Sequence, residues 1–243
     1  GTCESERSEI QAGISTCEPE PGFVWALGAG SGGGTSAASE TIYTSDGNLL
    51  VFGSYGGTID FDTGPGEAII TATGSDAYMF KLDPDGNLLW VKTAQGTGVT
   101  SVAAASEDGA GNLYVLFRFY GTTDFDPGAG EAFLTSVTSS PNNKSDLAIG
   151  KYDADGNFIW VRQIGGNSDE FGGEITTDAD GNAYVTGAFR GTTSVGGVFT
   201  LTARGSGSTD ALFSKLDTDG NFLWAKSIGS DATTAGNLYS DND

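Results

Sequence analysis

The chain has 243 residues, with 32 acidic and 11 basic side chains, a formal net charge of −21 and no histidine. Such an anionic surface repels nucleic-acid phosphates and anionic membranes, and the longest apolar runs are too short to span a bilayer. Without histidine, the chain can form neither a Ser-His-Asp triad nor a histidine-ligated zinc site. We therefore expect no nucleic-acid partner and no insertion into a membrane.

Residues 1–21 form an N-terminal arm outside the repeated part of the chain, and they hold both cysteines, Cys3 and Cys17. Residues 8–16 alternate in polarity, which predicts a strand with three apolar side chains on one face: Ile10, Ala12 and Ile14. The two isoleucines also fit one face of a helix. We keep two interpretations, a frayed terminus with a local disulfide and an arm that completes a neighbouring chain.

A disulfide within the arm requires the chain to bend back on itself. Fourteen extended residue steps would separate Cys3 and Cys17 by about 46 Å, whereas bonded cysteines have Cα atoms within about 7 Å. A bond within the chain and a bond to a neighbouring chain both stay open. Either one suits an oxidising, extracellular setting.

From residue 22 onward the sequence repeats around four tryptophans, Trp25, Trp90, Trp160 and Trp224. The last three each follow an Asp-x-Asp-Gly-Asn segment, and a second Gly-Asn pair lies about 21 residues after each of the first three. Gly-Asn and Asp-Gly pairs between apolar runs predict β-hairpins, because these turns need positive φ angles. We expect one repeat domain over 22–243, with units at about 23–87, 88–157 and 158–221 and a partial unit at 222–243.

Each unit is predicted to contain four antiparallel strands, and no segment shows a long helical period with caps. The first strand is short, near 41–44, 101–105 or 174–177. The second is exemplified by 112–120 and the third by 77–82 or 211–216; a long connection joins them. The fourth strand carries the tryptophan, which we expect in the core of the repeat rather than in a sugar-binding platform. The predicted fold is all-β.

The repeat resembles the SBBP-type, seven-bladed β-propeller repeat proteins that bacteria secrete. The similarity rests on three segments, Asp180-Gly-Asn-Ala-Tyr-Val-Thr-Gly187, Gly121-Thr-Thr-Asp-Phe-Asp-Pro-Gly128 and Asp210-Ala-Leu-Phe-Ser-Lys-Leu-Asp217, and on the Gly-Asn-Phe-x-Trp strand starts. It covers roughly residues 22–230. The resemblance implies a propeller-like array of four-stranded blades, export and the bacterial cell surface, and it supplies no catalytic residue.

The strand count predicts an incomplete ring. Residues 22–29 supply a lone fourth strand, three full blades follow, and the chain after Trp224 has room for one further strand at most, which makes about 3.5 blades. Propellers close with about four to eight blades. Open strand edges are templates for pairing with another chain.

Two acidic connections are candidate cation sites. They read Asp60-Phe-Asp-Thr-Gly-Pro-Gly-Glu67 and Asp124-Phe-Asp-Pro-Gly-Ala-Gly-Glu131. The carboxylates that would bind calcium are Asp60, Asp62 and Glu67 in the first, and Asp124, Asp126 and Glu131 in the second. The competing interpretation is a solvated loop that inserts Phe61 or Phe125 into the core. We expect no other cofactor.

These patterns favour a non-catalytic, extracellular structural protein. We expect it to associate with copies of itself, into a surface filament or ring, through open strand edges and the N-terminal arm. The alternative is a cell-surface binding or adhesion module that recognises a glycan or a protein with the help of calcium. Carboxylate pairs for glycoside hydrolysis would arise by chance in so acidic a chain, so we predict no enzyme activity.

Overall fold

The computed structural model describes residues 34–62, 64–137, 144–205 and 207–230. These residues form sixteen β-strands and no helix, which confirms the predicted all-β fold. No part of the described chain is therefore a helix that could cross a membrane. The arm with Cys3, Cys17, Ile10, Ala12 and Ile14 lies outside the described residues, as do Trp25 and the strand predicted at 22–29.

Twelve of the strands form three antiparallel, four-stranded sheets, which we call blades. The first contains β1 (Thr35–Tyr43), β2 (Leu49–Asp60), β3 (Ile69–Leu82) and β4 (Leu88–Gly96). The second contains β5 (Val99–Glu107), β6 (Leu113–Tyr120), β9 (Asp146–Tyr152) and β10 (Phe158–Gly166). The third contains β11 (Glu170–Thr177), β12 (Ala183–Arg190), β15 (Thr209–Leu216) and β16 (Phe222–Ile228).

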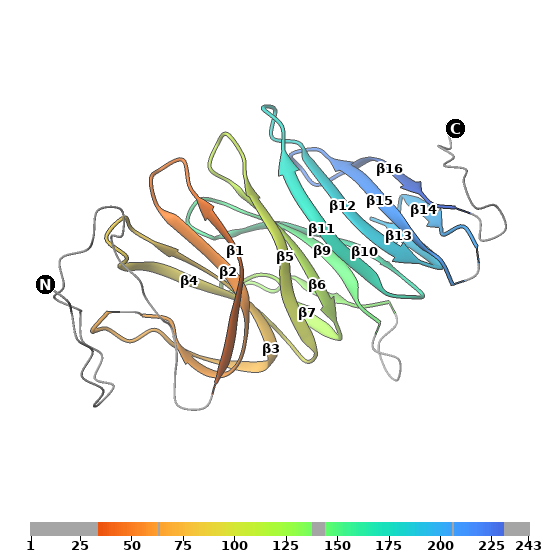
Figure 1. Cartoon of the computed structure of the whole chain (residues 1–243). Helices are drawn as coiled ribbons and strands as arrows, with labels where there is room; N and C mark the ends of the chain where they lie inside the picture. The colour runs from red at the N-terminus through yellow and green to blue at the C-terminus, as the bar shows by residue number, and fades with distance from the viewer. Residues whose placement is uncertain (1–33, 63, 138–143, 206, 231–243) are drawn as a thin grey trace, which may run out of the picture.

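The blades follow one another along the molecule in chain order, with the second between the other two (Figure 1). Strand β5 packs against β1, β2 and β3 on one side and against β11 on the other. The first strand of each blade is longer than predicted. These strands are rich in Ser, Thr, Ala and Gly, so they lack the alternation that marks a half-buried strand, although β5 and β11 pack between blades.

The hairpin turns within the blades are built as their sequences predict. In the turn from β3 to β4, the Asp83 carboxylate accepts hydrogen bonds from the backbone amides of Asp85 and Asn87, at 3.0 and 2.8 Å. Gly86 has a φ of 84°, which glycine adopts without the steric penalty of a side chain. The turns at 153–157 and 217–221 have the same hydrogen bonds.

The predicted connection between the second and third strands of a blade is itself a small hairpin. In the second blade it consists of β7 (Thr122–Asp124) and β8 (Phe133–Thr135), and in the third of β13 (Thr192–Val195) and β14 (Phe199–Thr202). Strand β7 pairs with β4, and β13 pairs with β10. Each of these hairpins therefore extends the sheet of the preceding blade and ties two blades together.

Two apolar cores lie between the blades. Leu50, Phe52 and Met79 of the first blade pack with Leu113, Val115 and Phe117 of the second. The alternate side chains of the second blade, Tyr114, Leu116 and Ile149, pack with Val185, Leu212 and Leu216 of the third. The second blade is buried on both faces, which explains why its strands are apolar throughout rather than alternating.

Candidate functional site

Every blade carries an equivalent three-residue row across its second, third and fourth strands, with Leu or Tyr in the second strand, Lys in the third and Trp in the fourth. The rows are Leu50–Lys81–Trp90, Tyr114–Lys151–Trp160 and Tyr184–Lys215–Trp224. Residues that pair across neighbouring strands project from the same side of the sheet. We call this side the Trp face of each blade.

The Trp face of the second blade binds main-chain carbonyls of the third. The Lys151 ammonium and the Trp160 indole N–H both donate to the carbonyl oxygen of Thr218, at 3.1 and 3.0 Å. The Tyr114 hydroxyl donates to the carbonyl of Gly181 at 2.7 Å. Burial beneath the third blade raises the pKa of Tyr114 to about 12 and keeps its hydroxyl a donor. The acceptors are main-chain carbonyls, so these contacts depend on the course of the turns rather than on the side chains in them.

The third blade has the same row without such a partner among the residues that the structure describes. The Lys215 ammonium lies 4.8 Å from the centre of the Tyr184 ring, as Lys151 lies 4.9 Å from that of Tyr114. Lys215 and the Tyr184 hydroxyl instead contact the Asp178 carboxylate of their own blade, at 3.4 and 3.1 Å. All three residues of the row are only half-buried.

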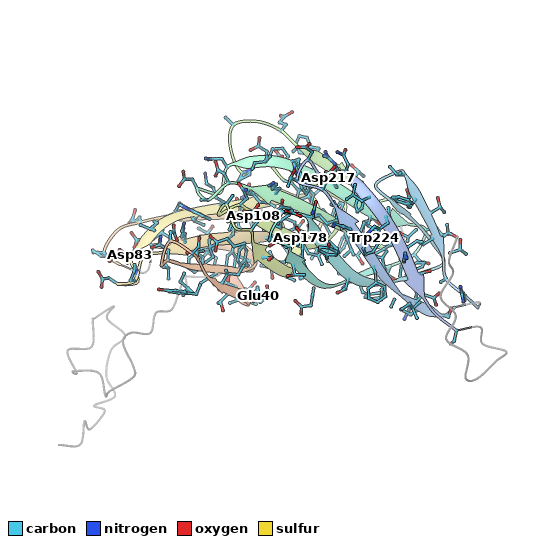
Figure 2. All side chains as sticks on the ribbon, turned by 90° about the horizontal axis from the view of Figure 1, so that it is seen from above. Glu40, Asp83, Asp108, Asp178, Asp217 and Trp224 are labelled. Carbon is cyan, nitrogen blue, oxygen red and sulfur yellow. The ribbon has the colours of Figure 1, made fainter. Side chains whose placement is uncertain are left out.

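The difference in burial between the two faces is large. Tyr114 is fully buried and Trp160 is 7% exposed. Their counterparts on the third blade are half-buried, and Ile228, the counterpart of the fully buried Ile164, is 42% exposed. Among the described residues, the Trp face of the third blade is thus an uncovered counterpart of a surface that packs against a neighbouring blade elsewhere in the chain. Trp224 and the turn residue Asp83 lie towards opposite ends of the row of blades (Figure 2).

Carboxylates in the turns beside these rows are held in the charged state. The Asn182 side-chain amide donates to Asp178, and this hydrogen bond, with the others around it, keeps the pKa of Asp178 well below its usual range. The Lys81 ammonium of the first blade does the same for Asp46, at 2.7 Å. The acidic groups nearest the rows therefore attract cationic and hydrogen-bond-donating groups at neutral pH.

A second candidate site is a pair of buried carboxyl groups, Asp146 and Glu170, where the second and third blades meet. Asp146 begins β9 and Glu170 begins β11, and the Glu170 amide donates to the Ser145 carbonyl at 2.8 Å. Both side chains are fully buried. Burial, reinforced by the nearby Asp146 charge, raises the pKa of Glu170 to about 8. Burial also raises the pKa of Asp146.

The two acidic connections proposed as calcium sites organise their own loops. The Asp60 carboxylate accepts from the amides of Asp62 and Ala68, at 3.0 and 2.8 Å, and Asp124 accepts equally from Asp126 and Ala132. Phe61 and Phe125 are buried at 1% and 0% exposure. No three acidic or cysteine side chains converge on a metal position in the described part of the chain. Calcium binding here stays a prediction.

The four predicted core tryptophans differ in burial. Trp160 is buried, Trp90 and Trp224 are half-buried, and Trp25 lies outside the described residues. The sequence interpretation missed the buried Lys81 and Lys151 and the pair Asp146–Glu170. A signal for them is present, because each blade's third strand carries an Asp followed five residues later by Lys: Asp76 and Lys81, Asp146 and Lys151, Asp210 and Lys215.

Comparison with known families supports this architecture. Residues 159–188, which span most of β10, all of β11 and part of β12, match a family model described as a beta-propeller repeat. The resemblance found in the sequence is confirmed over this segment, which is similar to a beta-propeller repeat. No curated protein matches the chain in sequence.

Proposed function

We propose that this chain is a non-catalytic structural subunit of the bacterial cell surface that associates with copies of itself by stacking blades. The observation that carries the proposal is the half-buried row Tyr184–Lys215–Trp224. The equivalent row of the second blade is buried by a following blade. A second copy that supplied such a blade would complete the same contacts.

The edge of β16, which has no partner strand in the described part of the chain, supports the same interaction. Strands β4 and β10 receive β7 and β13 close to their C-terminal ends, at Gln95–Gly96 and Ile164–Gly166. Strand β16 pairs only with β15 in the described chain. The corresponding positions, 228–230, present backbone groups that an added strand can pair with. β-strand addition and burial of the Trp face would thus occur together.

The strongly negative charge opposes such an association at long range. A net charge of −21 makes two copies repel each other, and salt screens this repulsion over about 10 Å at 0.1 M. We therefore expect assembly to strengthen as the salt concentration rises. A contact that is not closed by symmetry continues from copy to copy and gives a filament, whereas one that closes gives a ring.

The decisive experiment is the mass and shape of the full chain, measured by light scattering and negative-stain imaging over a range of protein and salt concentrations. The double variant Lys215→Ala/Trp224→Ala should shift the chain to a particle of about 25 kDa. Leu223→Ser is the matched control, because Leu223 is 50% exposed and lies next to Trp224, on the other side of the strand. A wild-type monomer under all conditions would contradict the proposal.

A second candidate is a surface-binding module that recognises a glycan. It is favoured by one observation, the half-buried rings of Tyr184 and Trp224, whose centres lie 6.2 Å apart beside the Asp178 carboxylate. Aromatic faces next to hydrogen-bonding groups are suited to sugars. Binding of glycans to a monomeric chain, lost in Trp224→Ala, would select this function, and chelation of calcium would test its cation dependence.

A further inference from the structure

The Asp146–Glu170 pair is enclosed by backbone as well as by side chains. Gly166 passes so close that an added Cβ would lie 3.0 Å from a carboxylate oxygen of Glu170. The hydroxyl of Thr193, from the hairpin that ties the two blades together, is also fully buried there. The pair therefore lies in the joint where β9, β10, β11 and β13 meet, and both side chains are shielded from solvent.

Several oxygen atoms in this joint lack a hydrogen bond of good geometry. One Asp146 oxygen accepts from the Val137 amide at 2.9 Å and from the Gln163 side chain. The other Asp146 oxygen, both oxygens of Glu170 and the Thr193 hydroxyl are buried without a hydrogen bond of good geometry, although the Gly166 amide and the Thr193 hydroxyl lie near these carboxyl groups and favour their charged forms. Two buried charges left in this state would be strongly destabilising, so something positive must compensate them.

The surrounding charged groups do not supply that compensation. Asp169, next to Glu170, accepts from the Lys144 ammonium at 2.8 Å and lies 3.9 Å from the Arg118 guanidinium. On β12, the Arg190 guanidinium donates to Thr209 and lies over the Phe171 ring. None of these cations forms an ion pair with Asp146 or Glu170 in the described structure.

A proton fits the joint better than a metal ion. Calcium takes six to eight oxygen ligands, and the unpartnered oxygens number only four. The Gln163 side chain also directs an N–H group at Asp146, which a cation would repel. A single proton between the two carboxyl groups needs no further ligand and converts two lone acceptors into one hydrogen bond.

The joint between the first and second blades shows that the fold does not need this pair. Thr100 and Glu170 occupy equivalent places. Thr100 pairs with the phenylalanine two residues before Gly121, and Glu170 pairs with the phenylalanine two residues before Gly191. The Thr100 hydroxyl bonds to the Thr123 hydroxyl at 2.8 Å. The corresponding acid, Asp76, accepts from the amides of Thr73 and Gly96, at 2.8 and 3.0 Å. Glu170 is therefore an addition that makes one joint ionisable.

We infer that Asp146 and Glu170 share one proton, and that loss of this proton at alkaline pH loosens the joint between the second and third blades. The raised pKa of Glu170 means that the folded chain binds the proton more tightly than the unfolded chain. The stabilisation that this proton provides is complete below the ordinary glutamate pKa of about 4.5. It decreases as the pH rises from about 4.5 to about 8, and it does not change with pH above that. Folding and opening of this joint become linked to pH.

The test is the melting temperature of the full chain from pH 5 to pH 10, compared among wild type, Glu170→Gln and Glu174→Gln. The neutral amide of Glu170→Gln mimics the protonated pair, so its melting temperature should lose the decline of several degrees that wild type shows. Glu174 is exposed on the same strand, so Glu174→Gln should follow wild type. Identical pH courses for wild type and Glu170→Gln would overturn the inference.

Infrared spectroscopy keeps the test decisive if Glu170→Gln fails to fold. Wild-type protein at pH 7 should show the carbonyl band of a protonated carboxylic acid, and the band should disappear at pH 10. A wild-type spectrum without this band at pH 7 would overturn the inference.

Discussion

Gly220 of the third blade lies directly against the indole of Trp160 in the second. A Cβ added to Gly220 would come within 2.9 Å of that ring, and the Arg162 guanidinium donates to the Gly220 carbonyl at 2.9 Å. The residue serves two purposes, because its φ of 80° forms the turn and its missing side chain allows the indole to approach. The turn is thus a contact surface as well as a chain reversal.

This relationship predicts different outcomes for two glycine substitutions. Gly220→Ala combines a strained positive φ with a collision against Trp160, whereas Gly197 has a φ of 72° and open space around it. Gly197→Ala should cost about 1–2 kcal/mol from backbone strain alone. Gly220→Ala should lower the free energy of unfolding further, by about 1–3 kcal/mol more. Urea titration of both variants checks this, and equal losses would show that the blades do not press on this turn.

The hydroxyls of two equivalent tyrosines should also differ in their effect. Tyr114→Phe leaves the Gly181 carbonyl without its donor in a fully buried joint and should cost about 1–3 kcal/mol. Tyr184→Phe removes a bond to Asp178 at a half-buried surface, so the loss should be smaller. Chemical denaturation of dilute protein measures both. A larger loss for Tyr184→Phe would mean that its face is covered in solution.

An ionisable joint should be transferable to the neighbouring pair of blades. Thr100→Glu would place a buried carboxyl beside the Thr123 hydroxyl and the Asp76 carboxylate. Loss of the Thr100–Thr123 bond alone should cost about 1–3 kcal/mol. The loss of stability should grow with pH, because the new carboxyl group becomes charged while it is buried. Thermal melts at pH 5 and pH 9 test this. A penalty that does not depend on pH would indicate that the joint admits water.

A substitution in the acidic loops can distinguish a structural role of these loops from a role in cation binding. Asp124→Ala removes the acceptor of two backbone amides and should cost about 1–2 kcal/mol with or without calcium. Melting of wild type and variant in calcium and in chelator distinguishes the two roles. Stabilisation of wild type by calcium, absent in the variant, would establish the cation site, because an ion that binds only the folded chain raises its stability.

Much of the architecture could be read from local sequence patterns. The Asp-x-Asp-Gly-Asn turns locate the hairpins, because positive φ angles and carboxylate acceptors act within five residues. The regular recurrence of Trp90, Trp160 and Trp224 locates the blades. The first strands were predicted too short, since Ser, Thr and Ala gave no alternation where β5 packs between two blades.

The candidate sites depend on contacts that no local pattern encodes. Lys81 and Lys151 are buried beneath a following blade, whereas Lys215, which has no following blade in the described chain, is only half-buried. Asp146 and Glu170 are 24 positions apart and meet only because two sheets pack face to face. The hairpin β7–β8 pairs with β4 rather than with a strand of its own blade.

The sequence by itself therefore determined the strand order, the turns and the repeated β-blade, because these follow from backbone preferences and period-two patterning over short distances. Only the tertiary structure decided which face is uncovered, which carboxyl groups share a buried joint and which hairpin joins which blade. Those features arise from packing between units far apart in the chain, where burial changes the free energy of a charge or an aromatic ring without changing the local sequence.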